Sequence, residues 1–91
     1  MHFEWDPAKS ERNRISRGLP FSLAVELFEG FVTEEVAARQ DYGEKRMKAI
    51  GRASGYILAC VYTDRGPVRR IISLRFASRK ERDGYHKSLQ G

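Results

Sequence analysis

Residues 68–85 require two different secondary structures in immediate succession. The first half of the stretch alternates as a strand does, because neighbouring side chains of a strand point to opposite faces of a sheet. The pattern changes after Ala77, where Ser78 and Glu81 have the spacing of a capping box and predict the start of a helix. The predicted strand directs Ile71, Ser73 and Arg75 to one face, and Ile72, Leu74 and Phe76, an apolar row, to the other.

Three arginines surround this junction between strand and helix, and we expect them to lie close together. Arg75 is near the end of the strand, and Arg79 and Arg82 are in the first turns of the helix. Guanidinium groups bind phosphate through several hydrogen bonds, so the cluster predicts a phosphate-binding site. Any one of these arginines taken alone is more often a solubilising residue or the partner of a surface carboxylate, and their number favours the binding site.

The composition is that of one folded domain with excess positive charge. The 91 residues are 41% hydrophobic and 32% charged, which is typical of a single domain spanning residues 1–91. Seventeen Lys and Arg against twelve Asp and Glu give a formal charge of +5. This charge favours a polyanionic partner, either nucleic acid or an acidic protein, and does not distinguish between them.

The sequence predicts a cytoplasmic protein. Cys60 is the single cysteine, so it cannot form an internal disulfide, and its apolar neighbours predict a buried, inert thiol. The first residues lack the basic and then apolar order of a signal peptide, and no apolar run approaches the ~20 residues of a membrane-spanning helix. We therefore expect no membrane partner.

Cap and turn signals predict an α+β fold. It consists of an antiparallel sheet of three to four strands, with two N-terminal helices and one C-terminal helix packed against one face. The Glu-Glu-Val-Ala-Ala segment of the first strand would also suit a helix. The predicted helices run from Pro7 to about Ser16, from about Phe21 or Ser22 to Gly30, and onward from Ser78; the predicted strands are 31–39, 44–52, 56–63 and 68–76, with turns at 41–43 and 64–67.

The sequence offers little for metal or triad chemistry. His2 and His86 lie at opposite ends of the chain, and no carboxylate pair has the spacing of a dedicated metal site. A nucleophile turn of the Gly-x-Ser-x-Gly kind is also absent from the sequence. We therefore expect neither a metal nor another cofactor.

What remains is a set of basic residues that could act on RNA without a metal. In such cleavage the ribose 2′-OH attacks the adjacent phosphate, a base removes its proton, and guanidinium groups stabilise the developing charge. Glu44 could serve as the base, and Tyr85 or His86 as the proton donor. The basic set comprises Arg46 and Lys48 on one strand face, Arg75 on a neighbouring strand, Arg79 and Arg82 on the last helix, and Lys9 and Arg12 on the first.

Structural explanations compete with these roles. Glu44 and Arg46 could be cross-strand partners of other charges, and Tyr85 could pack its ring on the sheet. From charge and spacing alone, three functions are nearly equal: a nuclease, a non-catalytic nucleic-acid binder, and a basic partner of an acidic protein.

A family pattern separates these alternatives. Its opening is Trp-Asp-x-x-Lys-x-x-x-Asn and its later strand is Arg-Ile-Ile-Ser-x-Arg, and both are present in the right order. With these residues the chain resembles the BrnT toxins of bacterial type II toxin-antitoxin systems. The matching segments are Phe3 to Lys9, Asn13, Gly18 with Phe21 and Ala24, Glu44 to Arg46, Ile50-Gly51, and Arg70 to Ser78 with Glu81 and Tyr85.

The resemblance implies a RelE-like fold and RNA cleavage that inhibits translation. It also implies neutralisation by a BrnA-like antitoxin, through which the complex contacts operator DNA. Carried over by position, the implied catalytic residues are Arg46, Arg75, Lys9, Glu44 and Tyr85, and the accompanying RNA-binding residues are Lys48, Arg79, Arg82, Arg12 and Arg17.

One departure concerns the end of the first helix. The family commonly has Lys-His-Gly there, whereas this chain has Ser16-Arg17-Gly18. Arg17 keeps a cation but cannot act as a neutral base near pH 7, because guanidinium does not lose its proton there. If the family's His is catalytic, this chain is expected to be a weaker nuclease or to position RNA differently; if that His is structural, the change is tolerable.

Overall fold

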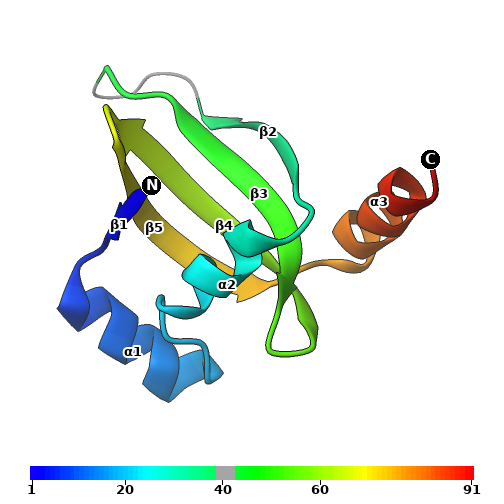
Figure 1. The fold of residues 1–91 in the computed structure, drawn as a ribbon. Coiled ribbons are helices and arrows are strands. Elements are labelled where there is room, and N and C mark those ends of the chain that lie inside the picture. Colours follow the sequence, from blue (N-terminus) through cyan, green and yellow to red (C-terminus); the bar gives the residue numbers. More distant parts are fainter. Residues whose placement is uncertain (39–42) are drawn as a thin grey trace.

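The computed structural model describes residues 1–38 and 43–91 and shows an α+β fold built on one mixed sheet (Figure 1). In this part of the chain the sheet has five strands in the order β1-β5-β4-β3-β2. Strands β2 to β5 form an antiparallel meander, and β1 pairs in parallel with β5. The elements are β1 (His2–Glu4), α1 (Pro7–Arg17), α2 (Leu23–Glu29), β2 (Thr33–Ala38), β3 (Arg46–Ala53), β4 (Tyr56–Arg65), β5 (Val68–Phe76) and α3 (Arg79–Gln90).

The predicted order of helices and of the four meander strands is confirmed, with corrections to the sheet and to one turn. The sheet is mixed because β1, which the sequence did not predict, adds a parallel edge strand. Strand β4 extends to Arg65, so the following turn is shorter than the predicted 64–67. Residues 39–42 lie outside the described residues, and with them the predicted turn at 41–43 and the end of the first predicted strand.

The ends of α1 and α3 follow directly from local sequence. The Asp6 carboxylate accepts from the backbone N–H of Ala8, and Gly18 ends α1 in a left-handed conformation with φ of 75°. Ser78 and Glu81 form the predicted capping box at the start of α3. Both helix boundaries are therefore encoded by neighbouring residues.

A β-bulge in β5 corrects the predicted faces of that strand. Val61 of β4 pairs with Ser73, whereas the next residue, Tyr62, pairs with Ile71, so Ile72 is an extra residue. The bulge shifts the alternation by one, and Ile71 lies on the same face as Leu74 rather than opposite to it. Ile71 is consequently buried in the larger core, contrary to the alternation expected from the sequence.

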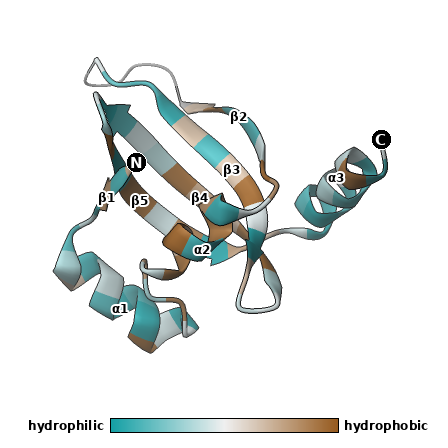
Figure 2. Cartoon of the chain, viewed as in Figure 1, coloured by the Kyte–Doolittle hydropathy of each residue, from teal (hydrophilic) through white to brown (hydrophobic). Residues whose placement is uncertain are grey.

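The two faces of the sheet carry different cores. On one, which we call the α2 face, α2 and the preceding loop pack on β3, β4 and β5; Leu27, Leu58 and Leu74 are fully buried there. On the opposite face, the α3 face, a smaller cluster gathers around Tyr85 of α3 and Ile50 of β3. The prediction that all helices cover one face is therefore wrong, since α3 packs on the other side. Figure 2 shows how largely hydrophilic α1 and α3 are, which fits their small buried contacts.

Helix α1 covers the part of β5 that β1 leaves open. Strand β1 pairs only with residues 68–70, so the outer edge of β5 is unpaired beyond them. Asn13 of α1 donates its side-chain amide to the Leu74 carbonyl at 2.9 Å, and Arg17 donates to the same oxygen at 3.3 Å. These bonds satisfy an edge carbonyl that would otherwise be available to another strand.

Replacement of Gly51 by alanine is expected to destabilise the fold. A Cβ at this position would lie 2.9 Å from Leu27 Cγ and 2.9 Å from Val32 Cγ1, too close for either side chain in a packed core. We expect Gly51→Ala to lower the free energy of unfolding by about 1–3 kcal/mol, measured by urea denaturation. Gly84→Ala is the control, because its Cβ would meet nothing within 4 Å in α3, and unchanged or raised stability is expected there. Equal stability of Gly51→Ala and the wild type would contradict this packing.

Candidate active site

Pairing register places Arg46, Lys48 and Arg75 on the same side of the sheet, the α3 face. Arg75 pairs with Ala59 of β4, which pairs with Ile50 of β3, and alternation along β3 adds Lys48 and Arg46 to that face. Arg46 and Arg75 do not meet in one pocket, however. Arg46 is four residues along β3 and two strands across from the row of Arg75, which corresponds to about 13 Å by about 10 Å between backbone positions.

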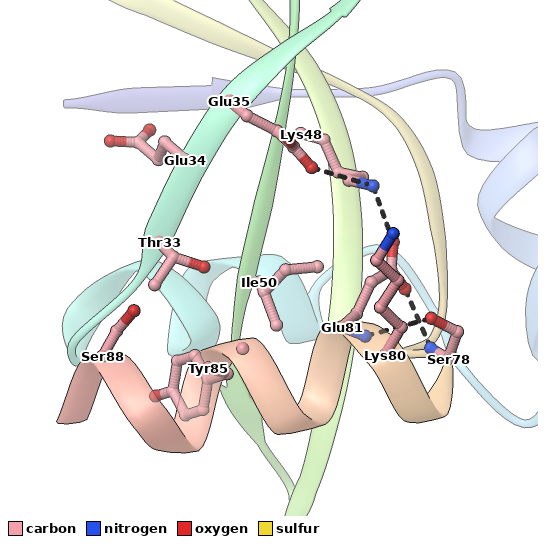
Figure 3. A pocket seen from close by; sticks show the side chains of 11 residues that line it. Thr33, Glu34, Glu35, Lys48, Ile50, Ser78, Lys80, Glu81, Tyr85 and Ser88 are labelled. Atoms are coloured by element: carbon pink, nitrogen blue, oxygen red, sulfur yellow. Dashed lines mark hydrogen bonds and ion pairs between the residues drawn. The ribbon is translucent and has the colours of Figure 1, made fainter. Parts of the chain in front are cut away.

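Arg75 and Lys48 converge on a single carboxylate, that of Glu81 in α3. Arg75 donates from Nη1 to Oε1 at 2.8 Å and from Nη2 to Oε2 at 3.0 Å. Lys48 donates to Oε2 at 2.7 Å (Figure 3). The Glu81 side chain is only 13% exposed, against 22% for Lys48 and 40% for Arg75. Three elements, β3, β5 and the first turn of α3, thus meet at one buried acid.

This network carries no net charge. Lys48 also lies 3.1 Å from the Glu35 carboxylate, so two cations face two anions. The hydrogen bonds from Arg75 hold the pKa of Glu81 far below its ordinary value, and the bonds from Lys48 and from the Ser78 backbone act in the same direction. Glu81 is therefore an anion at neutral pH and a weak base, since a carboxylate with so low a pKa holds a proton poorly.

A cleft of about 480 Å³ runs between α3 and the strands β2 and β3, beside this network (Figure 3). Tyr85 and Ile50 form its apolar floor, while its rim carries both signs of charge. Such mixed lining does not select a phosphate by charge. The lining residues are Thr33, Glu34, Glu35, Lys48, Ile50, Ser78, Lys80, Glu81, Gly84, Tyr85 and Ser88.

Glu44 and Arg46 lie at the far end of the α3 face among other ion pairs. Arg65 donates from Nε to Glu44 at 2.8 Å, and Arg70 lies 3.3 Å from Glu4. The hydrogen bond from Arg65 lowers the pKa of Glu44, and the nearby charge of Arg46 adds to the effect. A carboxylate with a lowered pKa is a weak base at neutral pH, so this pairing disfavours the base role considered for Glu44.

A second hollow lies between α1 and the edge of β5 and is lined by several cations; we call it the α1–β5 groove. It measures about 290 Å³ and contains Lys9, Arg12 and Arg17, without any acidic residue in its lining. Among the described residues none of these three cations forms an ion pair. Asn13, Ser16, Phe21, Ile72 and Ser73 complete the lining.

Ser73 connects the groove with the α3 face. Its side chain lines the groove, and it lies two residues from Arg75 on the same face of β5. Two residues of a strand span about 7 Å, which is close to the separation of successive phosphates in an extended nucleic acid strand. The groove and Arg75 can therefore contact neighbouring phosphates of one chain.

The remaining predicted residues are placed differently from the expectation. Tyr85 is 3% exposed, packs against Phe31 and donates its hydroxyl to the Phe31 carbonyl at 2.8 Å. This is the packing role that was weighed against a role as proton donor. Arg82 donates to the Ala77 carbonyl at 2.9 Å. Arg79 is two residues from Glu81 and so projects from nearly the opposite side of α3, away from Arg75. The three arginines at the junction do not converge.

Cys60 lies where the sequence predicted it, inside the core. It is fully buried on the α2 face, and burial raises the pKa of its thiol to about 12. A thiol with so high a pKa is almost entirely protonated at neutral pH and is a poor nucleophile.

The pH dependence of stability should reveal the Glu81 network. Because folding lowers the pKa of Glu81 below the ordinary value of 4.5, its ion pairs stabilise the fold fully above pH 4.5 and lose that contribution as the pH falls below it. We expect Glu81→Gln to be less stable than the wild type at pH 7, and this difference to shrink toward pH 3. Urea denaturation of both proteins at several pH values measures it. A difference that is independent of pH would contradict the proposed ionisation.

Sequence reasoning missed Glu81 as a partner of Arg75 and Lys48. The capping-box spacing identified Glu81 only as a local helix signal. A weak further signal existed, since Glu81 lies on the same helix side as Tyr85, four residues later, and Tyr85 was expected to face the sheet. Nothing in the sequence indicated which cations of the sheet the carboxylate would reach.

The described residues contain no group of three or more His, Cys, Asp or Glu side chains arranged to hold a metal ion. None of the helices in residues 1–38 and 43–91 has the length and apolar character needed to cross a bilayer.

Comparison with known proteins gives one family. The model of the family described as ribonuclease toxin, BrnT, of type II toxin-antitoxin system matches residues 5–81, which is most of the chain. A comparison with curated proteins gives no match. The matched segment contains α1, the whole meander and the Arg75–Glu81 ion pair. The chain therefore belongs to the BrnT family of type II toxin-antitoxin ribonuclease toxins.

Proposed function

We propose that the protein is an endoribonuclease toxin that cleaves RNA without a metal, inhibits translation and is neutralised by a BrnA-like antitoxin. The observation that carries the proposal is the family match combined with a groove that holds three cations and no acid beside Arg75. Ribonuclease chemistry of this kind needs little more than a bound, correctly oriented phosphate and a cation for the developing charge.

The RNA backbone would lie in the α1–β5 groove and pass over the edge of β5. Lys9, Arg12 and Arg17 would bind the flanking phosphates, and Asn13 would maintain the groove by holding the β5 edge. Arg75, two residues beyond Ser73, would then contact the scissile phosphate. Arg46 lies further along the α3 face, where it would attract the departing strand, whereas the charge of Lys48 is balanced by Glu35 and Glu81.

The proposed reaction is attack of a ribose 2′-OH on the neighbouring phosphorus. A bond forms between O2′ and phosphorus, the bond from phosphorus to O5′ breaks, the 2′ proton passes to a base, and O5′ receives a proton. Arg75 would stabilise the charge on the phosphoryl oxygens. Glu44 was considered as the base, but it lies at the far end of the α3 face from Arg75 and its pKa is lowered. Water would therefore take the 2′ proton and supply the proton to O5′, and charge stabilisation by Arg75 would supply most of the acceleration. Tyr85 is not used, because its hydroxyl is engaged with Phe31.

Purified protein incubated with RNA and excess chelator tests this function. We expect cleavage to continue in the chelator and to leave 2′,3′-cyclic phosphate ends, which the 2′-OH reaction requires. Induced expression of the chain alone should arrest bacterial growth. Intact RNA in the presence of folded protein, or cleavage that appears only on addition of a divalent metal, would refute the proposal.

The antitoxin would neutralise the toxin by covering its RNA-binding surface. A BrnA-like antitoxin would bind over Arg46, Arg75 and α3, and its own DNA-binding part would take the complex to operator DNA. Hydrogen exchange of the toxin alone and in the complex tests this, with protection expected along β5 and α3. A complex that leaves both elements unprotected and still abolishes cleavage would contradict the covering mechanism.

A second function is favoured by one observation, namely that Arg75 and Lys48 already bind carboxylates. A non-catalytic protein whose basic face binds an acidic partner or nucleic acid would use such contacts. It would bind RNA without cleaving it, so the same chelator assay separates the two functions.

A further inference from the structure

We infer that Glu81 is a positioning residue, which acts on the reaction by fixing the side chains of Arg75 and Lys48. The inference rests on the proposed function, because it assigns Arg75 to the scissile phosphate. It adds a carboxylate to a site that otherwise consists of cations. Glu81 itself would touch neither the RNA nor the reacting atoms.

Both oxygens of the Glu81 carboxylate are fully used. Oε1 accepts from Arg75 Nη1 at 2.8 Å and from the Ser78 backbone N–H at 2.8 Å. Oε2 accepts from Arg75 Nη2 at 3.0 Å and from Lys48 Nζ at 2.7 Å. The carboxylate is thereby anchored to its own helix start on one side and to two strands on the other. Its low exposure, 13%, keeps water from competing for these bonds.

This geometry orients Arg75. A free arginine side chain has several rotatable bonds, whereas a two-pronged bond to a fixed carboxylate determines the plane of its guanidinium. Both terminal nitrogens then point to Glu81, and the edge that includes Nε remains available in a side chain that is 40% exposed. The guanidinium presents this edge in one orientation, which is the condition for stabilising a transition state without reorganisation.

An RNA phosphate is not expected to displace Glu81. The carboxylate is tethered beside both cations, so its effective concentration there exceeds that of any phosphate in solution. Its bonds to Arg75, Lys48 and Ser78 would all have to break together. We therefore treat the Arg75–Glu81–Lys48 network as the state that binds RNA.

The variant Glu81→Gln separates positioning from helix capping. Glutamine serves a capping box as glutamate does, so α3 should keep its start. It cannot accept two bonds from Arg75 and one from Lys48, because one of its two terminal groups is a donor. The variant also raises the local charge by one, which should strengthen attraction for RNA. The loss of orientation should lower kcat, whereas the gain in positive charge should strengthen RNA binding. The two effects are therefore measured separately.

The expected result is a divided effect on kcat and KM. We expect Glu81→Gln to lower kcat for RNA cleavage by about ten- to a hundredfold, as small misplacements of catalytic groups do. Glu81→Gln should bind an RNA with a 2′-deoxy substitution at the cleaved position as tightly as the wild type does, or more tightly. Glu35→Gln is the matched control, since it removes the other carboxylate from Lys48 without touching Arg75. Its kcat should stay close to that of the wild type.

Nitrogen NMR of the Arg75 side chain gives a readout that does not depend on activity. The bidentate bond should slow rotation of the guanidinium in the wild type and in Glu35→Gln, and rotation should be fast in Glu81→Gln. Unchanged kcat in Glu81→Gln, or a kcat that rises, would overturn the inference; so would slow rotation that persists in that variant. If the wild type cleaves no RNA at all, the proposed function fails, while the rotation measurement still decides whether Glu81 positions Arg75.

Discussion

Arg75→Ala should reduce metal-independent RNA cleavage by about 10²–10³-fold in a protein that remains folded. Arg75 adjoins the α1–β5 groove through Ser73, and two hydrogen bonds to Glu81 orient its guanidinium. Removing a preoriented group that stabilises transition-state charge typically costs this much in rate. Single-turnover cleavage of a defined RNA in excess chelator, with saturating protein, measures the effect apart from binding.

Two further variants define the role of Arg75. Arg75→Lys keeps the charge but loses the fork that binds Glu81, so it should recover only part of the rate. Arg14→Ala is the control. Arg14 pairs with Glu11 on the exposed side of α1, so this substitution removes one positive charge at a position away from the site. Arg75→Ala that cleaves as fast as Arg14→Ala would show that the scissile phosphate binds somewhere else.

The second large effect is expected on RNA affinity. Replacing Lys9, Arg12 and Arg17 together by alanine removes the three cations of the α1–β5 groove. For single-stranded RNA each phosphate contact contributes about 0.7 to the slope of log K against log salt, so the slope should decrease by about 2. At 0.1 M salt the same three contacts correspond to about a hundredfold in affinity. Fluorescence anisotropy with a non-cleavable RNA at several salt concentrations measures both quantities.

A second triple variant controls for net charge. Arg14, Arg52 and Lys87 are exposed cations that do not line the groove, and their joint replacement by alanine removes the same total charge. We expect this variant to lose much less affinity and to keep most of the salt slope. Equal losses in the two triple variants would show that RNA responds to overall charge and not to the groove.

The fold was predictable from sequence where its signals are local. Asp6 and Gly18 determine the ends of α1, and the box formed by Ser78 and Glu81 determines the start of α3. In each case the residues that form the structure are neighbours in the sequence. The meander was predictable for the same reason, since short connections join its strands.

Features that depend on distant residues were not predictable. Strand β1 has three residues and acquires its partner from β5. The bulge at Ile72 is a property of the pairing between β4 and β5, and the adjacent apolar residues Ile71 and Ile72 do not by themselves indicate which of them is the extra residue. The side of the sheet that α3 covers is set by packing of Tyr85 on Ile50, two residues from different elements.

The candidate site likewise combines features that follow from local sequence with features that depend on distant residues. Alternation along β3 correctly placed Arg46 and Lys48 on one face of that strand, and the register through β4 adds Arg75 of β5 to the same side. It could not give their distances or their partners, because these depend on where α3 docks. The gathering of the cations of α1 beside Ser73 depends in turn on how α1 covers the edge of β5.

The parallel pairing of β1 with β5 has a consequence for synthesis on the ribosome. Phe3 is made well before its partner Arg69, which follows nearly the whole meander in the sequence. Until β5 has left the ribosome, the nascent chain lacks both the outer strand pair and the strand that carries Arg75. The ribosome that makes this toxin therefore holds an unfinished sheet, and the surface that carries Arg75 forms only after β5 has emerged.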